Sequence, residues 1–536
     1  MLALTRRFCG ISVALLLALV CAAPSSAAED VVVQGTTDVR DAGLLDDVIV
    51  PGFEAAYPQY NLQYVAVGTG QALTNARNGQ GDAVLTHAAP LEAQFVADGY
   101  SAEQYGRAIF YSDYVILGPQ SDPAGVLSGA AHNAAHAFEL IAAAGGSGTV
   151  NFVSRGDNSG TNVAEEQIWN RTTGVTLCDV ASGRKRPYSQ TGACTGGTEQ
   201  GWYHRAGLGQ AQTVQLADQC PFSGGNCYEM TDRGTFNRLV STGAITNLKV
   251  VSDRNDAAAP GGKDLLVNSF HAYAVNPAKF SPGTIDQTGA TAFLDYLTSR
   301  DFQSRLASYP NQSDPAFFAS AAPTITGSLP AEVTAGEPLT VSGSVTNNTP
   351  GTPALGSVGV QLFATGTSLG EPGAVASATT ASDGSYSLGF TPVRSGLYSL
   401  QTPQITETVI PGTPPFGDIL QPGNLTLGNV TVRSTITLDS AKAKPGKVHV
   451  KGAIAPETGR SDPKLILLGK RKGGKGGKGK SGFRKLGSVG LSQTGAGFNK
   501  RFDVRPGRYR VQVRYSDLGI VESATSDALR VKVPKD

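Results

Sequence analysis

The amino-acid sequence predicts two α/β lobes around a cleft over residues 29–320, followed by two all-β sandwiches over residues 323–435 and 436–536. Two observations lead to this fold class. The first part of the chain repeats a pattern of an apolar strand, a turn rich in Gly and Thr, and a stretch of helical composition. After about residue 320, short alternating runs are instead separated by frequent turn signals.

Residues 1–28 have the features of a secretion signal. Two arginines precede an apolar core over residues 11–20, and small residues follow up to Ala28. The apolar core is too short to span a bilayer. Cys21 raises the alternative of lipid attachment, but the valine before it is bulkier than lipoprotein signals favour, so we expect cleavage after Ala28. The expected location is secreted, periplasmic or associated with the cell envelope.

The most informative stretch is FVSRGDNSGT at residues 152–161. An apolar strand breaks at a glycine turn that carries Arg155, and Ser159 and Thr161 then open a stretch of helical composition. Free backbone N–H groups and the helix dipole favour an anion at such a helix start, and a guanidinium fork fits a tetrahedral oxyanion. Taken alone, the pattern fits an ordinary helix cap with a surface arginine equally well.

Two earlier turns repeat this arrangement. Thr36 and Thr37 follow an apolar strand and precede an apolar run at 42–49 that suits a helix. Thr69 and Gly70 lie between the next strand and a second helical stretch. Three such junctions are what a closed anion pocket between two α/β lobes requires, so the sequence favours an anion site over three unrelated caps.

The chain resembles the tungstate-binding proteins that deliver an oxyanion to ABC importers, within the type II periplasmic binding-protein fold. The matching segments are GTTDVRDAGLLDD, VAVGTGQAL, GDAVLTHAAPLEAQFVADGY, YSDYVILGPQSDPAG, SRGDNSGT, WYHRAGLGQAQ, EMTDRGTF and LLVNSFHAYAVNP. RGDNSGT would also fit phosphate-binding relatives, whereas GTGQAL, YSDYVILGP and MTDRGTF favour the tungstate branch. The resemblance implicates Thr36, Thr37, Thr69, Arg155, Ser159, Thr161 and Arg233 as oxyanion ligands, and Asp38 and Gly70 complete the predicted site.

The function that the resemblance implies is capture of a small tetrahedral oxyanion, with tungstate or molybdate favoured, for an ABC permease. The alternatives are a phosphate-binding protein, or a cell-surface adhesion or sensing protein that kept the binding fold. The sequence has no Ser-His-Asp arrangement and no phosphate-cradling lysine loop, so we expect a monomeric binding protein without enzymatic activity, cofactor or metal.

The first turn departs from the family pattern, which usually has a run of threonines followed by serine. Gly35 and Asp38 stand at the two ends of that run here. A carboxylate repels a fully deprotonated ligand unless it points away or pairs with Arg40, but it accepts a hydrogen bond from an oxyanion that keeps a proton, as phosphate does. Asp38 as a simple cap of the following helix is the third interpretation.

Four cysteines remain after the signal, an even number that suits an oxidising compartment. Of the three possible connectivities, sequential pairing closes two small loops and is our choice. It gives the disulfides Cys178–Cys194 and Cys220–Cys227. The spacings, without a nearby histidine, do not indicate a zinc site.

The two predicted sandwiches share turn features. Turns at 383–386 and 396–398 resemble those of bacterial immunoglobulin-like (Ig-like) modules, and similar sequences recur at 498–502 and 506–509. We therefore predict two tandem Ig-like sandwiches.

The formal net charge of +1 hides a strong charge asymmetry. Residues 436–536 carry 23 Lys and Arg against 8 Asp and Glu, while the rest of the chain is net negative. The stretch at 469–485 is rich in Gly and Lys, so it predicts a solvated cationic loop that attracts polyanions. Because its first twelve residues, GKRKGGKGGKGK at 469–480, include no aromatic residue for base stacking, we expect an anionic cell-envelope polymer and no nucleic acid. A purely solubilising loop is the alternative.

Overall fold

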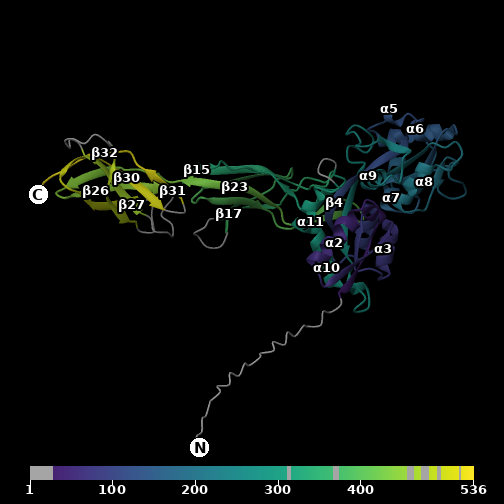
Figure 1. Cartoon of the computed structure of the whole chain (residues 1–536), viewed down its shortest axis with the longest axis horizontal. Helices are drawn as coiled ribbons and strands as arrows, with labels where there is room; N and C mark the ends of the chain where they lie inside the picture. The colour runs from purple at the N-terminus through teal and green to yellow at the C-terminus, as the bar shows by residue number, and fades with distance from the viewer. Residues whose placement is uncertain are drawn as a thin grey trace, which may run out of the picture.

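The structure is a computed structural model that describes residues 28–310, 315–365, 373–455, 464–471, 482–491, 497–517 and 521–535. Figure 1 shows a two-part head formed by the first half of the chain, and two strand-rich modules that extend from it in line towards the C-terminus. No helix among these residues combines the length and apolar character of a membrane span. The predicted signal before Ala28, including Cys21, and residues 472–481 of the predicted basic loop lie outside the described residues.

A mixed sheet runs through the head, in the order β2-β1-β3-β12-β4-β10-β5-β9. Its strands are β1 (Glu29–Thr36), β2 (Tyr60–Val67), β3 (Ala83–Thr86), β4 (Gly106–Pro119), β5 (Asn151–Ser154), β9 (Tyr203–Arg205), β10 (Cys227–Asp232) and β12 (Val267–Ala274). β11 (Leu248–Ser252) and β13 (Phe318–Ala319) pair with β4 off this path. β1 runs parallel to β2 and β3, so these three strands end at the same edge of the sheet.

β4 connects two lobes. Its first half, up to Asp113, pairs with β12, and its second half, from Tyr114, pairs with β10. Lobe 1 contains β2, β1, β3, β12 and the start of β4, whereas lobe 2 contains the end of β4 with β10, β5, β9 and β11. Each lobe buries a separate apolar core. Among its largest members are Phe53, Phe110 and Phe293 in lobe 1, and Phe138, Phe152 and Trp169 in lobe 2.

Helices follow the strands and cover the sheet. They are α1 (Thr37–Asp41), α2 (Val50–Ala56), α3 (Thr69–Arg77), α4 (Ala89–Ala97), α5 (Val126–Gly129), α6 (Ala134–Gly146), α7 (Gly160–Trp169), α8 (Gln210–Gln219), α9 (Arg233–Ser241), α10 (Gln287–Thr298) and α11 (Arg300–Leu306), with a π-helical turn η1 (Leu45–Ile49) and a 3-10 turn η2 (Pro277–Lys279). The junctions β1–α1, β2–α3 and β5–α7 confirm the three predicted strand–turn–helix junctions.

The predicted helix over 42–49 is wrong in its bounds. The chain becomes helical already at Thr37, directly after β1, and α1 ends at Asp41. Gly43 then has a φ of +84°, a left-handed conformation that interrupts the helix before η1 and α2 continue it. The early start of α1 is important for the site, because it places the first helical N–H groups next to Thr36 and Thr37.

Two disulfides cross-link peripheral segments of lobe 2. Cys178–Cys194 connects β6 (Leu177–Ala181) to the segment after β8 (Gly192–Ala193), in a small sheet that also contains β7 (Arg184–Pro187). Cys220–Cys227 connects the end of α8 to the start of β10. These are the sequential pairs that the sequence analysis favoured.

The region after residue 320 is rich in strands, as predicted. The first module contains β14 (Thr324–Ile325), β15 (Glu332–Thr334), β16 (Leu339–Thr346), β17 (Gly359–Thr365), β18 (Gly373–Thr379), β19 (Ser385–Phe390), β20 (Gly396–Gln401) and β23 (Asn424–Arg433). Its sheets are β14-β16-β19 and β18-β17-β20-β23, and buried Val341, Val360 and Leu388 are part of its core. The relation to Ig-like domains stays a prediction.

The second module has the same plan. Its strands are β24 (Thr435–Ile436), β25 (Ser440–Lys444), β26 (Lys447–Ala455), β27 (Lys464–Arg471), β28 (Arg484–Gly490), β29 (Gly497–Asp503), β30 (Gly507–Asp517), β31 (Val521–Thr525) and β32 (Leu529–Val533). One sheet groups β24, β25 and β29 around β26, and the other groups β28, β27, β30, β31 and β32. β23 bridges to β31, so one sheet continues from the first module into the second.

One hairpin from the first module belongs to the sheet of the head. β21 (Ile405–Ile410) and β22 (Phe416–Leu420) pair with each other, and β22 also pairs in parallel with the start of β4. The residue partners are Asp418 with Gly106 and Ile419 with Arg107. The module at 323–435 is therefore joined to lobe 1 by backbone pairing as well as by the chain itself.

Candidate anion-binding site

The predicted turns come together between the two lobes. Thr36 ends β1, Thr37 begins α1 and Thr69 begins α3, so these hydroxyls lie where the parallel strands of lobe 1 end. Arg155 follows β5 in lobe 2, and Ser159 caps α7, where its Oγ accepts a hydrogen bond from the first helical turn. All five residues are buried. The site thus combines helix starts from both lobes with one cation.

The guanidinium of Arg155 is the cationic centre of this cluster. Its Nη1 donates to Thr37 Oγ1 across the cleft (3.2 Å) and to Gln210 Oε1 (2.7 Å). Its Nη2 donates to Asp157 Oδ2 (2.6 Å), an aspartate of the same turn. These contacts hold the planar group in one orientation, as binding a tetrahedral anion through two N–H groups requires.

Three buried donors in this cluster have no hydrogen-bond partner among the described residues. They are Thr36 Oγ1, Thr69 Oγ1 and Arg155 Nε. Leaving one buried donor unpaired costs about 1–3 kcal/mol, and folded proteins rarely concentrate such groups. Together with the charge of Arg155 they match a small anion, since Arg155 Nε can only donate and an apolar ligand would leave all three groups unsatisfied.

Asp38 lies in the same turn and pairs with a histidine that the sequence analysis did not select. Asp38 Oδ2 is 3.0 Å from His87 Nε2, and both side chains are almost fully buried. His87 Nδ1 lies 2.9 Å from the hydroxyl of Tyr114, which donates its own proton to Asn268. His87 Nδ1 must therefore be the donor in that contact, and with Nε2 facing a carboxylate the ring carries both protons.

The pKa shifts of the pair have the same physical origin. Burial alone raises the pKa of Asp38, but the charge of His87 and its hydrogen bond outweigh burial and lower it overall. Burial alone lowers the pKa of His87, but Asp38 outweighs burial and raises it. Asp38 is thus neither the cap of α1, whose N-cap is Thr36, nor a partner of Arg40, which pairs with Asp41. The negative charge of Asp38 is compensated inside the site.

Arg233 is not in the cluster, contrary to the prediction. Its guanidinium forms hydrogen-bonded ion pairs with Asp113 on β4 and with Asp253 after β11. Burial alone would lower its pKa, but the hydrogen bonds to Asp113 outweigh this and raise it. At Asp113, β4 passes from lobe 1 to lobe 2, and we call this point of β4 and its neighbouring strands the hinge. Arg233 therefore connects β4 to the segment after β11 at the hinge. The side-chain partners of Arg233 among the described residues are these two aspartates, and neither is a predicted ligand.

Gln210, at the first position of α8, is a second residue that the sequence analysis missed. Its Oε1 accepts hydrogen bonds from Arg155 and from Thr161 Oγ1 (2.8 Å), and its backbone N–H donates to Thr37 Oγ1 (3.3 Å). Thr161, a predicted ligand, is thus joined to the cluster through this amide. The segment WYHRAGLGQAQ contains Gln210 at another glycine-led helix start, which is the signal that could have identified it.

The two lobes are closed against each other at this site. The backbone N–H of Gly70 donates to the carbonyl of Asn158 (3.2 Å), so this predicted ligand serves a contact between the lobes. The N–H of Ala211 donates to Asp41 across the cleft (2.9 Å). A Cβ added to Gly160 would lie 2.3 Å from the His87 ring, so glycine is required for this approach of α7 to lobe 1.

Buried acids line lobe 2 behind Arg155. Burial and then the nearby Glu165 raise the pKa of Glu229 well above its usual range, although Arg155 lowers it. Burial and then the charge of Asp38 together raise the pKa of Asp232 to about 7. These raised pKa values reduce the negative charge of this wall at neutral pH, so it opposes an anion less than fully ionised carboxylates would. Among the described residues no cluster of three or more His, Cys, Asp or Glu could hold a metal ion.

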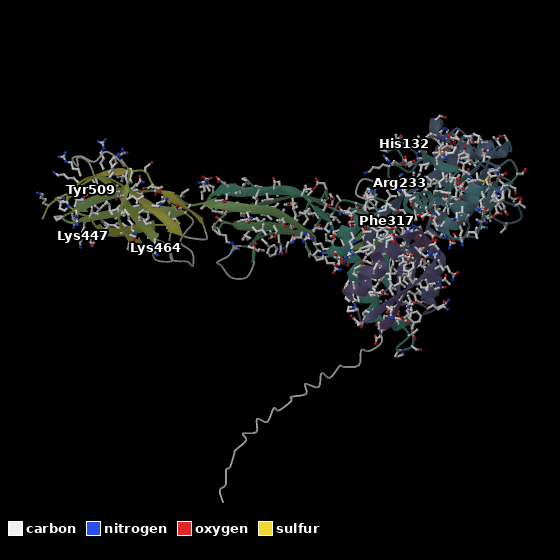
Figure 2. The ribbon with its side chains drawn as sticks, viewed as in Figure 1. His132, Arg233, Phe317, Lys447, Lys464 and Tyr509 are labelled. Atoms are coloured by element: carbon white, nitrogen blue, oxygen red, sulfur yellow. A yellow bond between two sulfur atoms is a disulfide. The ribbon has the colours of Figure 1, made fainter. Side chains whose placement is uncertain are left out.

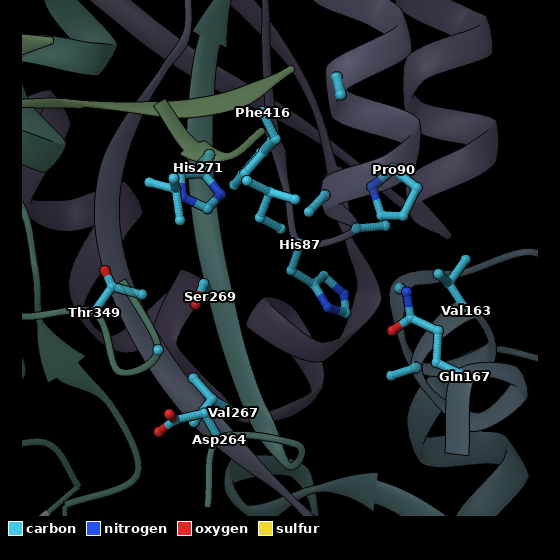
Figure 3. A pocket seen from close by; sticks show the side chains of 18 of the residues that line it. His87, Pro90, Val163, Gln167, Asp264, Val267, Ser269, His271, Thr349 and Phe416 are labelled. Atoms are coloured by element: carbon cyan, nitrogen blue, oxygen red, sulfur yellow. The ribbon is translucent and has the colours of Figure 1, made fainter. Parts of the chain in front are cut away.

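A cavity of about 540 Å³ lies beside this site, between both lobes and the first module. Figure 3 shows His87 projecting into it, with Val163 and Gln167 of α7 on one side and Thr349 and Phe416 of the first module among the other residues of its wall. Residues of the hairpin β21–β22 and of the turn between its strands also line the cavity. The first module therefore forms part of the wall next to the hinge strands.

A family model described as the PBP superfamily domain matches residues 22–301 of the chain. An anion-binding protein assigned to an ABC transporter of Haloferax volcanii is 33% identical over 315 residues, which cover 58% of this chain and 79% of that protein. The tungstate-binding protein TupA of Peptoclostridium acidaminophilum is 28% identical over 279 residues, which cover 52% of this chain and 81% of the relative.

Among solved structures, a tungstate ABC transporter protein from Geobacter sulfurreducens is 32% identical to the chain. The match covers 53% of this chain and 100% of that protein, with a TM-score of 0.40. The match to the family model ends at residue 301, before the strand-rich modules begin.

Proposed function

This chain belongs to the PBP superfamily, and we propose that it captures a tetrahedral oxyanion, tungstate or molybdate in preference, for import by an ABC permease. One observation carries the proposal: Thr36 Oγ1, Thr69 Oγ1 and Arg155 Nε are buried groups without hydrogen-bond partners among the described residues, and Arg155 reaches across the cleft to Thr37, next to Thr36. Capture needs no chemistry, because the ligand is held by hydrogen bonds and released when the lobes open. No cofactor is required, and the protein acts as an exported monomer.

The Asp38–His87 pair bears on which oxyanion is bound. A lone carboxylate would repel a doubly charged, fully deprotonated anion such as tungstate. Because His87 compensates Asp38, this carboxylate adds no uncompensated negative charge beside Arg155, whose own guanidinium is paired with Asp157. This supports tungstate or molybdate as the ligand, as does the similarity to tungstate-binding proteins.

Phosphate is the second candidate, and one observation favours it. Asp38 Oδ1 has no hydrogen-bond partner among the described residues, so it is available to accept the proton that phosphate keeps at neutral pH. Calorimetric titration of the full chain with tungstate, molybdate, phosphate, sulfate and chromate separates the candidates. Binding of tungstate and molybdate alone supports the proposal, binding of phosphate alone supports the alternative, and no binding of any oxyanion rejects both.

We further propose that the basic stretch at 469–485 retains the protein at an anionic cell-envelope polymer. The proposal rests on the positive excess of residues 436–536 in a chain that is otherwise net negative. Release of the chain from isolated envelopes by rising salt would support it.

A further inference from the structure

A cluster of cations occupies one sheet of the second module. We call it the cationic face, and it consists of Lys470 on β27, Arg508 and Arg510 on β30, and Arg530 and Lys532 on β32. Side chains alternate along these strands: Tyr509, Val511, Val531 and Val533 are buried, whereas the five cations are exposed. Figure 2 shows nitrogen-tipped side chains standing out from this module around Tyr509 and Lys464.

The register of the strands brings like charges into direct opposition. Arg508 is the cross-strand partner of Lys532, and Arg510 is the partner of Arg530 on one side and of Lys470 on the other. Directly opposite residues share a face and lie close together, so like charges there are destabilising. No carboxylate in the described part of the chain forms an ion pair with any of the five. The module thus keeps an unfavourable arrangement that an external anion would relieve.

The shape and extent of the cationic face indicate the kind of anion. The five residues, with Tyr509 and Val531, line a groove of about 580 Å³. The cations lie in two rows about 7 Å apart along the strands, on strands about 5 Å apart. One phosphate or sulfate cannot contact charges spread over such a surface, whereas a chain of regularly spaced anions follows it.

We infer that the cationic face binds a linear phosphate-bearing polymer with a polyol-phosphate backbone. Three of the five residues are arginines, whose guanidinium forks match phosphate oxygens in pairs. A lipid bilayer fits less well, because no large apolar side chain of the described part of 436–535 is exposed for insertion. Nucleic acid also fits less well, because the aromatic ring in the groove, Tyr509, is buried under the cations and offers no surface for base stacking.

This inference is separate from oxyanion capture, since the face lies in a different module. It also differs from retention by the stretch at 469–485, with which the face shares only Lys470. Three variants of the full chain with equal loss of charge distinguish the possibilities. The first replaces Arg508, Arg510 and Arg530 by serine. The second replaces Lys472, Lys475 and Lys478 of the loop. The third replaces Lys442, Lys447 and Arg501, which are exposed on the opposite sheet.

The measurement is binding of each variant to a polyglycerol-phosphate polymer over a series of salt concentrations. We expect the face variant to bind at least about tenfold more weakly at low salt, with a dependence of log K on log salt that is shallower by about two. The variant of the opposite sheet should stay within about twofold of wild type, and the loop variant should lose clearly less affinity than the face variant. Equal losses in all three variants, or an intact face variant, would overturn the inference, because binding would then depend on net charge or on the loop.

Two further measurements separate the effect of guanidinium geometry from that of charge, and weaker binding from loss of folding. Replacing the same three arginines by lysine preserves the charge but removes the planar guanidinium groups that donate paired hydrogen bonds to phosphate. Polymer binding should therefore weaken while the melting temperature is unchanged. The serine variant should melt no lower than wild type, because it removes like-charge pairs. Single-stranded DNA or phosphatidylglycerol vesicles that bind as tightly as the polymer would reject a polymer-specific face.

Discussion

The imidazole of His271, on strand β12 of lobe 1, lies 3.0 Å through Nε2 from Asp418 Oδ1, on strand β22 of the first module. Its Nδ1 lies 3.1 Å from Glu92 on α4, so one buried cation bridges two carboxylates from two parts of the chain. Phe416 packs edge-on against the same ring. This bridge locks the hairpin onto lobe 1, immediately beside the hinge strands.

The bridge predicts a pH dependence of stability. Burial alone lowers the pKa of His271, but hydrogen bonds to Asp418 and Glu92 outweigh it and raise the pKa to about 10. Because the pKa rises from about 6.5 in the unfolded chain, the stabilisation is complete below pH 6.5 and is lost as pH rises towards 10. The melting temperature of wild type should fall across this window.

Asp418→Asn should flatten that pH profile and lower stability at pH 6.5 by about 3–5 kcal/mol, since it leaves a buried charge with one partner fewer. Asp383→Asn, at an exposed turn of the same module, is the matched control and should have little effect. An unchanged slope in Asp418→Asn would show that His271 does not control this titration.

Arg155→Ala should weaken oxyanion affinity by at least about a hundredfold, because the site loses a buried cation and its fork of donors. Arg155→Lys should recover only part of the loss. Arg305→Ala, at an exposed pair with Asp301, controls for the loss of one arginine. Calorimetry on folded protein is the measurement, and wild-type affinity in Arg155→Ala would place the site elsewhere.

Asp38→Ser should raise the ratio of tungstate to phosphate affinity by about tenfold or more. A serine hydroxyl donates to any oxyanion, whereas a carboxylate accepts only from one that keeps a proton. Asp98→Ser, on the surface of lobe 1, is the control. A ratio that does not change would mean that Asp38 serves only to hold His87.

Gly160→Ala should prevent full closure of the lobes, because the new Cβ would lie 2.3 Å from the His87 ring. We expect a strong loss of affinity, a larger radius of gyration in the presence of ligand, and a folded protein. Gly201→Ala has open space around its added Cβ and an ordinary backbone, so it is the matched control. Wild-type compaction in Gly160→Ala would contradict closure at this contact.

Local patterns in the sequence were enough to select several residues that the fold brings together between the lobes. Thr36, Thr69 and Arg155 each stand at a strand end followed by a helix start, and such junctions depend on short-range backbone hydrogen bonding. The same local character explains why the disulfide pairs and the strand-rich second half were predictable. The bounds of the first helix were harder to predict. The chain takes a left-handed turn at Gly43, where Tyr309, Arg238 and Asp47 from later parts of the fold lie close to the backbone.

What only the tertiary structure decided was which charges meet. Arg233 follows a strand end directly, as Arg155 does, yet Asp113 from β4 holds it where that strand passes between the lobes. Asp38 and His87 are far apart in the sequence, and β1 and β3 place them in contact only because those strands are neighbours. The sequence determined by itself where helices begin and which side chains bear charge. Long-range strand pairing determined their partners, since a charge pairs with whatever the fold brings within about 4 Å.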